Sequence, residues 1–207
     1  VSDTAGNPAT ATDTAALDTT AAITVSLDDV NSGNVAAAPI TGTTTGVEPG
    51  QTVTLAITDG TATVTVTAVV NPDGSYSTTA DLSGLADGPL TVTASVSDTA
   101  GNPATATDTA ALDTTAAITV SLEDVNSGSA DAAPITGTTN GVEAGQTVTL
   151  QITDGTATVT VTAIVNPDGS YTTTADLSTL ADGPLTVTAT VSDTAGNPAT
   201  ATDTAAL

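Results

Sequence analysis

The chain repeats itself with a period of 95 residues. Residues 1–95 return as residues 96–190 with eleven differences, and a third copy begins at Val191 and runs to Leu207. A period of this length is too long for one turn of a solenoid, but it fits one small domain per repeat. The sequence therefore predicts a row of small, nearly identical domains in one chain.

Within each repeat, Thr or Ser alternates with aliphatic residues, as in residues 52–57 and 90–96. Alternation with period two and many β-branched residues is typical of half-buried strands. Turn sequences rich in Gly, Pro, Asn and Asp separate these segments. We expect seven strands in the first repeat, at residues 23–27, 39–46, 52–58, 61–70, 75–82, 90–98 and 103–111.

Seven short strands at this spacing predict an all-β fold of tandem seven-stranded immunoglobulin-like β-sandwiches, without the Cys and Trp of antibody domains. The fourth strand could pair with the third or with the fifth, and the sequence favours neither. The core is expected to hold aliphatic side chains and one tyrosine. Its expected members are Ile23, Val25, Leu27, Ile40, Val53, Leu55, Ile57, Val64, Val66, Tyr76, Leu82, Leu90, Val92 and Val96.

The strand order also predicts where each unit begins and ends. Residues 1–17 are expected to be the C-terminal strand of a preceding, truncated repeat. Residues 18–112 then form the first domain and residues 113–207 the second. We therefore expect this chain to be part of a longer array of repeats.

The charge of the chain is entirely negative. It has 23 Asp and Glu and no Lys, Arg or His, which gives a formal net charge of -23. Nucleic acids and anionic membrane surfaces are bound through Lys and Arg, so neither is an expected partner. No apolar run is long enough for a transmembrane helix, so direct membrane insertion is not expected either.

The same composition argues against catalysis. Without His, Lys, Arg or Cys, the usual bases, activated nucleophiles and oxyanion clamps are missing. A glycosidase needs only two carboxylates, but its site usually adds aromatic platforms, and the only aromatic residues are Tyr76 and Tyr171. We therefore predict that the chain is not an enzyme.

Calcium is the cofactor that the composition favours. Hard carboxylate oxygens select Ca²⁺ or Mg²⁺ over softer metals. The chain has no cysteine for disulfides, and its expected cores are thin. Metal bound only by the folded state would add to its stability.

The candidate ligands lie in loops at the two poles of each domain. Because the strands alternate in direction, the first, third and fifth loops of one domain face the second, fourth and sixth loops of the next. The linker at residues 113–117 lies between them, and the predicted junction is acidic from both sides. The candidate ligands are Asp18, Asp28, Asp29, Asn31, Asp87, Asp98, Asp113, Glu123, Asp124, Asn126, Asp168, Asp182 and Asp193, with Glu143 and Asn197 as further oxygen donors.

A structural interpretation competes with the metal interpretation at several of these loops. Asp-Gly and Asn-Pro-Asp-Gly sequences form turns, which is the favoured interpretation for Asp59, Asp73 and Asp154. Residues 98–102 fit a tight turn and a ligand loop equally well. The adjacent acids Asp28 and Asp29 have no cationic partner anywhere in the chain, which favours metal binding there.

Six segments are distinctive when taken together, namely residues 38–43, 48–53, 71–76, 85–88, 96–102 and 112–116. With these segments the chain resembles the bacterial immunoglobulin-like extender repeats of giant RTX adhesins. The chain departs from the usual pattern at Ala22 and Ala117, where the linker of such repeats usually has Pro. The resemblance implies a secreted, cell-surface protein exported by a type I system, with Ca²⁺ at or near the junctions.

Two functions from different classes follow. The first is a structural extender, an elongated monomeric rod of neighbouring identical repeats that Ca²⁺ stiffens so that it projects an adhesive tip. The alternative is a glycan- or surface-binding immunoglobulin-like module that acts by avidity. No aromatic or basic cluster marks a binding face in the sequence.

Overall fold

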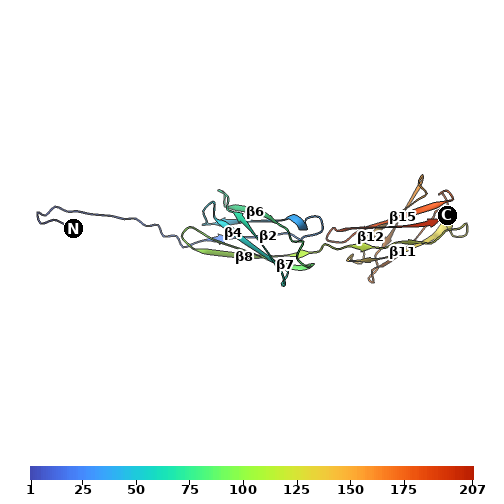
Figure 1. Ribbon diagram of the computed structural model, residues 1–207, viewed down its shortest axis with the longest axis horizontal. Coiled ribbons are helices and arrows are strands. Elements are labelled where there is room, and N and C mark those ends of the chain that lie inside the picture. Colours follow the sequence, from blue (N-terminus) through green and yellow to red (C-terminus); the bar gives the residue numbers. More distant parts are fainter.

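The molecule is an extended row of two β-sandwiches preceded by a thin N-terminal segment (Figure 1). The computed structural model describes residues 1–207. In the first sandwich one sheet contains β1 (Ala22–Ile23), β2 (Ser26–Leu27), β3 (Ala38–Thr45) and β6 (Ser75–Ala80). The facing sheet has the order β5 (Thr63–Val69), β4 (Thr52–Thr58), β7 (Gly88–Ser97) and β8 (Pro103–Leu112).

The second sandwich repeats this arrangement. Its first sheet contains β9 (Ala117–Ile118), β10 (Ser121–Leu122), β11 (Ala133–Asn140) and β14 (Ser170–Ala175). Its second has the order β13 (Thr158–Ile164), β12 (Thr147–Thr153), β15 (Pro184–Ser192) and β16 (Pro198–Ala206). The 3-10 turns η1 (Val35–Ala37) and η2 (Ala130–Ala132) are the helical elements, and no helix has the length and apolar character to cross a bilayer.

The predicted all-β immunoglobulin-like fold is confirmed. The question of the fourth strand is also answered, because β5 pairs with β4 in an antiparallel ladder from Thr52–Val69 to Thr58–Thr63. The first expected strand differs from the prediction, since it is divided into β1 and β2. Both pieces pair with β3 in one continuous register, so the strand is interrupted without a shift.

A tyrosine causes this interruption. Tyr76 lies opposite Gly42 in the β3–β6 ladder, and its hydroxyl donates a hydrogen bond to the backbone carbonyl of Thr24, between β1 and β2. A Cβ atom at Gly42 would lie 2.2 Å from the Thr24 carbonyl oxygen and 2.3 Å from the Tyr76 hydroxyl. Glycine is thus required there by close approach. Gly137 and Tyr171 repeat the arrangement in the second sandwich.

The core of each sandwich is small and mostly aliphatic. Two separate groups of buried side chains form, one from the first repeat and one from the second. Most of the expected core members are buried, and Tyr76 and Tyr171 are each 1% exposed. Ile23, Val64 and Val66 are only partly buried and lie on edge strands with one neighbouring strand. Val25 is also partly buried and lies in the interruption between β1 and β2.

Backbone amides of β2 and of the loop that follows it connect the first sheet to β8 of the facing sheet. The Leu27 amide donates to the Asp108 carboxylate at 3.0 Å, and the Val30 amide donates to the Ala111 carbonyl at 2.8 Å. Val30 therefore pairs in parallel with Leu112 at the end of β8. This pairing holds the β2–β3 loop against the start of the linker and so positions the loop at the junction.

Residues 1–17 lie outside both cores and are exposed. Near the N-terminus, Asp3 accepts hydrogen bonds from the amides of Ala5 and Asn7, each at 2.9 Å. The Asn7 side chain also donates to Asp3 at 2.9 Å. This turn matches the one that Asp98 and Asn102 form in the next copy.

Candidate functional site at the junction of the repeats

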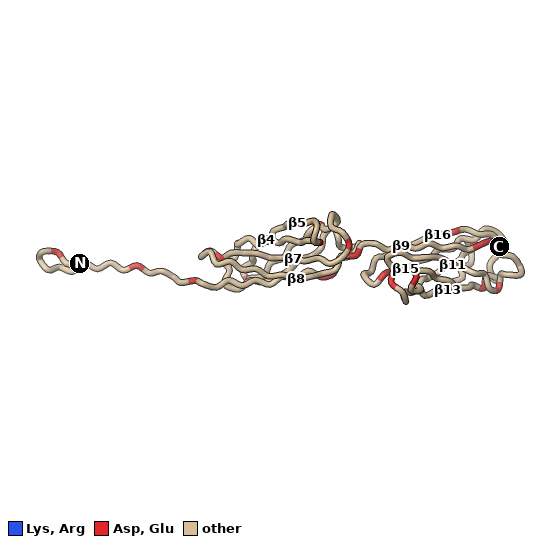
Figure 2. The backbone as a smooth tube through the Cα atoms, turned by 90° about the horizontal axis from the view of Figure 1, so that it is seen from below, with Lys and Arg blue, Asp and Glu red and all other residues tan.

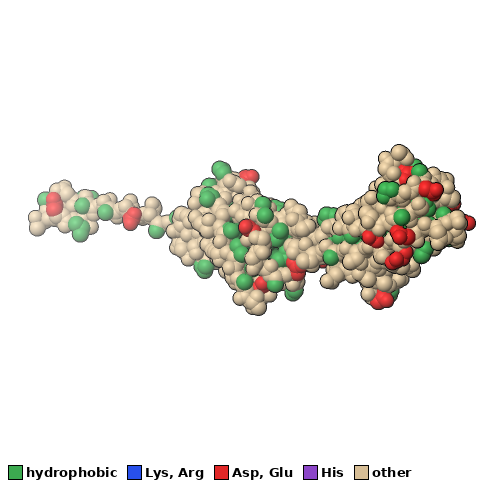
Figure 3. Space-filling view, turned by 45° about the vertical axis from the view of Figure 1, so that its right-hand side comes forward, with side chains coloured by type: hydrophobic (Ala, Val, Ile, Leu, Met, Phe, Trp, Pro, Cys, Tyr) green, Lys and Arg blue, Asp and Glu red, His purple; other side chains and the backbone are tan.

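The pole of the first sandwich meets the pole of the second around the linker, and acidic residues gather in the loops at these poles (Figure 2). The first sandwich contributes its β2–β3 and β6–β7 loops. The second contributes its β11–β12 and β15–β16 loops. Figure 3 shows the two sandwiches as lobes joined by a narrow neck.

The β15–β16 loop of the second sandwich is a tight, buried polar turn. Asp193 is 5% exposed and Asn197 is 1% exposed. The Asn197 backbone amide donates to Asp193 at 2.8 Å, and the Asn197 side-chain amide donates to the other carboxylate oxygen at 2.7 Å. The same side-chain nitrogen donates to the Asp113 carbonyl at 2.9 Å, which ties the turn to the linker.

The β2–β3 loop of the first sandwich reaches across to this turn. The Asn31 side-chain amide donates to the Ala195 carbonyl at 2.7 Å. The Ser32 backbone amide donates to the Asn197 side-chain oxygen at 2.7 Å. Two hydrogen bonds between uncharged groups therefore connect the sandwiches directly.

Asp87 of the β6–β7 loop holds the linker itself. Its carboxylate accepts hydrogen bonds from the Thr114 hydroxyl at 2.9 Å and from the Thr115 hydroxyl at 3.1 Å. The Thr114 amide donates to the same carboxylate at 3.2 Å. Both oxygens of Asp87 are thus engaged by linker residues.

A hollow of about 370 Å³ lies beside these contacts and is lined by three acids, Asp29, Asp113 and Glu143. The Asp29 carboxylate accepts a hydrogen bond from the Ala111 amide at 2.7 Å. Glu143 accepts one from the Thr194 amide at 2.9 Å. No group of three acidic side chains converges closely enough to hold a metal ion. The oxygens have the chemistry that Ca²⁺ prefers, but the structure does not assemble them into a ligand set.

The remaining predicted ligands lie at separate places. Asp28 is exposed beside Asp29, and Asp168 accepts hydrogen bonds from Ser170 in the β13–β14 turn. Asp18 and Asp98 lie at the N-terminal pole of the first sandwich, where the Asn102 side chain contacts both. The C-terminal pole of the second sandwich holds the others, Glu123, Asp124, Asn126 and Asp182. The ligand assignment for the full set stays a prediction.

Hydrogen bonds favour the ionised form of two acids of the junction, Asp193 and Glu143. Burial acts to raise the pKa of Asp193, but hydrogen bonds from the Asn197 side chain and backbone outweigh it and hold the pKa below its usual value. The Thr194 hydroxyl and amide lower the pKa of Glu143 in the same way. The site is therefore negatively charged at neutral pH, with no cation from the protein nearby.

Sequence reasoning identified the acidic loops but missed Ser32 and Ala195. Both act through backbone atoms, an amide and a carbonyl, and side-chain chemistry gives no signal for such contacts. The tight turn that is one interpretation of residues 98–102 forms there and again at residues 193–197. The ligand role of Asp98 and Asp193 stays a prediction.

Two solved structures of adhesion proteins are similar to most of this chain. A Ca²⁺-stabilised adhesin with which an Antarctic bacterium reaches out and binds ice is 30% identical, over 99% of this chain and 53% of that one, with a TM-score of 0.50. A tetra-tandem repeat from the extending region of a large adhesion protein is 39% identical, over 91% of this chain and 49% of that one, with a TM-score of 0.46. The predicted resemblance to the extender repeats of large bacterial adhesins is confirmed.

A single immunoglobulin-like domain is also similar to part of this chain. A bacterial immunoglobulin-like domain from the M. primoryensis ice-binding adhesin is 28% identical, over 45% of this chain and 96% of that one, with a TM-score of 0.33. The chain spans about half the length of the first two structures. No family model matches the chain, and no curated protein matches it.

Proposed function

We propose that this chain is a stretch of extender repeats, a spacer in a secreted, cell-surface bacterial adhesin that holds an adhesive tip away from the cell. The observation that carries the proposal is the end-to-end arrangement, in which Asn31 and Ser32 of one sandwich contact the next sandwich around a short linker. The resemblance to a bacterial adhesin that reaches out and binds ice supports it. We take residues 18–112 and 113–207 as the two units.

The strand directions explain why such repeats extend. The chain enters each sandwich at one pole, beside β1 or β9, and leaves at the opposite pole after β8 or β16 (Figure 1). Each added repeat therefore adds its full length to the row. The absence of Lys, Arg, Trp and Phe leaves no basic or aromatic face that would favour the glycan-binding alternative.

The finer part of the proposal is that Ca²⁺ stiffens the junction. Asp29 and Asp113 approach from the first sandwich and the linker, while Glu143 approaches from the second sandwich, and these like charges repel one another. Asp28 is exposed next to them. Bound Ca²⁺ would supply the positive charge that the protein lacks.

The remaining parts of the proposal concern the cellular setting. We propose that the chain lies outside the cell, that type I export carries it there, and that the rod is monomeric. A high net negative charge keeps rods apart in solution, which supports the monomer.

The first prediction concerns the overall shape and the melting temperature. In excess Ca²⁺, small-angle X-ray scattering of the chain is expected to give a longer maximum dimension than in EDTA, and Tm is expected to rise, because ion binding to the folded state adds to its stability. The EDTA sample is measured at matched ionic strength with NaCl. An identical dimension and an identical Tm in both samples would contradict the Ca²⁺ proposal.

The second part of this test compares two variants to show whether Ca²⁺ acts at the junction. Asp28→Asn removes one charge at the junction, whereas Glu123→Gln removes the equivalent charge at the free pole of the second sandwich. The Ca²⁺-induced change in shape is expected to decrease in Asp28→Asn alone. A decrease of equal size in both variants would mean that the Ca²⁺ ion responsible does not bind at the junction. Binding of the chain to a glycan array would instead favour the glycan-binding function.

A further inference from the structure

We propose that successive repeats are joined by an amide clasp that works without a metal ion. In this clasp the Asn31 side chain and the Ser32 amide of one repeat hold the Ala195 carbonyl and the Asn197 side chain of the next. The free halves of the same clasp, at Asn102 and Asn126, then each fit a further copy of this repeat. The clasp deepens the proposed spacer function, but it does not depend on Ca²⁺.

The clasp is specific because each group has a fixed partner. Asn197 donates through its side-chain nitrogen to Asp193 and to the Asp113 carbonyl, so its amide oxygen must point away from them. That oxygen accepts from the Ser32 amide at 2.7 Å. The oxygen of Asn31 accepts from the Gly33 amide at 2.8 Å, which points the Asn31 nitrogen toward Ala195.

Each half of the clasp has an equivalent elsewhere in the chain that lacks a partner, Asn102 for Asn197 and Asn126 for Asn31. Asn102 is held as Asn197 is, by Asp98 at 2.7 Å and by the Asp18 carbonyl at 3.2 Å, but no donor reaches its side-chain oxygen. Asn126 is held as Asn31 is, through the Gly128 amide at 2.9 Å, but its nitrogen donates to no acceptor. Both halves therefore have the local geometry of the clasp before a partner is present.

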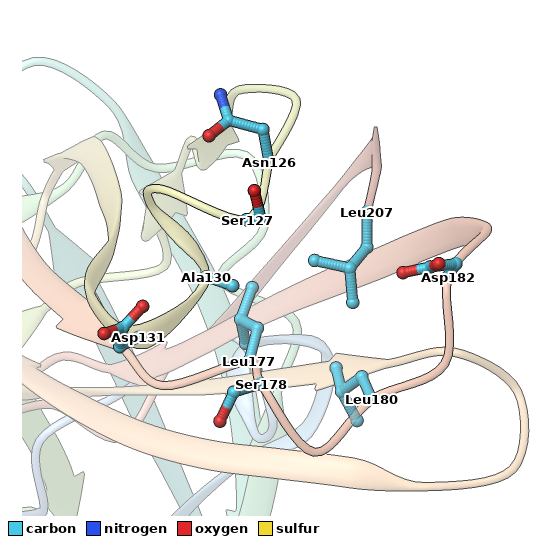
Figure 4. Close-up of a pocket in the computed structure, with 9 residues that line it drawn as sticks. All are labelled: Asn126, Ser127, Ala130, Asp131, Leu177, Ser178, Leu180, Asp182 and Leu207. Atoms are coloured by element: carbon cyan, nitrogen blue, oxygen red, sulfur yellow. The ribbon is translucent and has the colours of Figure 1, made fainter.

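The C-terminal pole also carries a hollow that fits a following repeat. Leu177, Leu180 and Leu207 converge on its floor, and Asn126 and Asp182 lie at its rim (Figure 4). The equivalent residues of the first sandwich are Asn31 and Asp87. Asn31 donates a hydrogen bond to the next sandwich, and Asp87 accepts one from the linker. The occupant that this hollow fits is therefore the linker and the β15–β16 type of turn from another copy.

The clasp consists of uncharged groups, which separates it from the acids around it. Hydrogen bonds between neutral groups depend little on salt, whereas repulsion among Asp29, Asp113 and Glu143 is screened by it. We therefore expect the clasp to set the angle between the repeats. Ca²⁺ or salt would raise the population of molecules that hold this angle.

The second prediction tests the clasp with a single-atom exchange. Asn31→Asp keeps an oxygen for the Gly33 amide but replaces the donor that faces the Ala195 carbonyl with a second oxygen. Asn126→Asp makes the same exchange at the free pole, where no partner is lost. Both exchanges add one negative charge, so the control matches the test variant in charge as well as in shape.

The measurement is a distance distribution between two spin labels in EDTA, by double electron–electron resonance. Because the chain has no cysteine, labels on Thr67→Cys and Thr162→Cys, both exposed and one in each sandwich, are unique. The parent is expected to show a narrow peak from the clasped arrangement. Asn31→Asp is expected to lower the population of that peak about fivefold, the ratio that one lost hydrogen bond typically gives, and Asn126→Asp is expected to leave it unchanged.

Circular dichroism melts of both variants check that each sandwich remains folded. A peak that needs Ca²⁺ and responds equally to both exchanges would overturn the clasp while leaving the Ca²⁺ proposal intact. A peak that persists in EDTA and decreases only in Asn31→Asp would support the clasp, even if Ca²⁺ changed neither shape nor Tm.

Discussion

Replacing Tyr76 with alanine is expected to unfold the first sandwich while the second remains folded. Tyr76 is the largest side chain in its core and is 1% exposed, among neighbours that are Ala, Val, Leu and Ile. Removing a buried aromatic side chain costs about 3–5 kcal/mol, and small neighbours fill the space poorly. Domains typically have about 5–15 kcal/mol of stability, and one with so small an aliphatic core lies at the low end of that range, so the loss removes most of its stability.

The hydroxyl group adds a second contribution. It donates to the Thr24 carbonyl, at the point where the first strand is interrupted, and burial raises the pKa of Tyr76 to about 12, so the hydroxyl stays a donor at neutral pH. Tyr76→Phe keeps the ring and loses this hydrogen bond alone. Its expected cost is about 1 kcal/mol.

Amide NMR spectra measure the outcome. In Tyr76→Ala about half of the dispersed amide signals are expected to collapse, and Tyr171→Ala is expected to do the same for the other half, since Tyr171 is the equivalent residue of the second core. Tyr76→Phe should retain all of them. Collapse of every signal in either alanine variant would mean that the two sandwiches fold as one unit, and full dispersion in both would contradict the role of the tyrosines.

Much of the fold could be predicted because the strands follow a simple alternation. The predicted segment at 52–58 has the bounds of β4, because buried Val53, Leu55 and Ile57 alternate with more exposed Thr and Ala residues. The positions of the acidic loops followed from the strand directions. The strand bounds and the loop positions could be predicted because both depend on the order of side chains over short segments.

The rest depends on contacts between distant residues. The interruption between β1 and β2 results from Tyr76, which is 52 residues away from Thr24. The contact of Ser32 with Asn197 spans 165 residues and uses a backbone amide. The sequence also does not show which groups an acidic loop residue will contact. Asp87, for example, accepts hydrogen bonds from the hydroxyls of Thr114 and Thr115 in the linker.

The turn acids show the same limit. Asp154 was expected to form a turn, and it does so by accepting hydrogen bonds from the Thr156 and Ala157 amides, each at 2.7 Å. Its second oxygen accepts from the Ala181 amide at 2.8 Å, which connects the β12–β13 turn to the β14–β15 loop. The sequence predicts the turn, while the connection between the two loops depends on the fold.

The acid stability of the chain follows from these hydrogen-bonded carboxylates, and we expect the protein to lose stability progressively as the pH falls below about 4. The Ala181, Ala157 and Thr156 amides hold the pKa of Asp154 far below its usual range, and Asp59 is held in the same way by the equivalent residues. The pKa of Asp98 is also lowered, chiefly by the Asn102 side chain. The unfolded chain therefore binds protons at a higher pH than the folded chain does.

This difference in proton binding between the folded and unfolded chains determines how stability changes with pH. A carboxyl group whose pKa is lowered by folding contributes stability that is present above its unfolded pKa of about 3.9 and is lost as the pH falls toward its folded pKa. Repulsion within a chain of formal charge -23 acts in the opposite direction, because protonation relieves it. The hydrogen-bond effect is expected to prevail below about pH 4, since its contacts are short and repulsion between exposed charges is screened by salt.

The measurement is Tm as a function of pH in EDTA with 0.15 M NaCl, a salt level that limits the Debye length to about 8 Å. Asp154→Asn is expected to lower Tm at neutral pH, because an amide nitrogen would then face the Ala181 amide. The difference in Tm between Asp154→Asn and the parent should narrow below about pH 4, where protonation of this carboxyl group in the unfolded parent begins to cancel its contribution to stability. Asp131→Ala is the control, since the first repeat carries Ala36 at that position and Asp131 accepts no hydrogen bond. A Tm that rises steadily down to about pH 3 would mean that charge repulsion, and not the hydrogen-bonded carboxylates, governs the stability of these repeats.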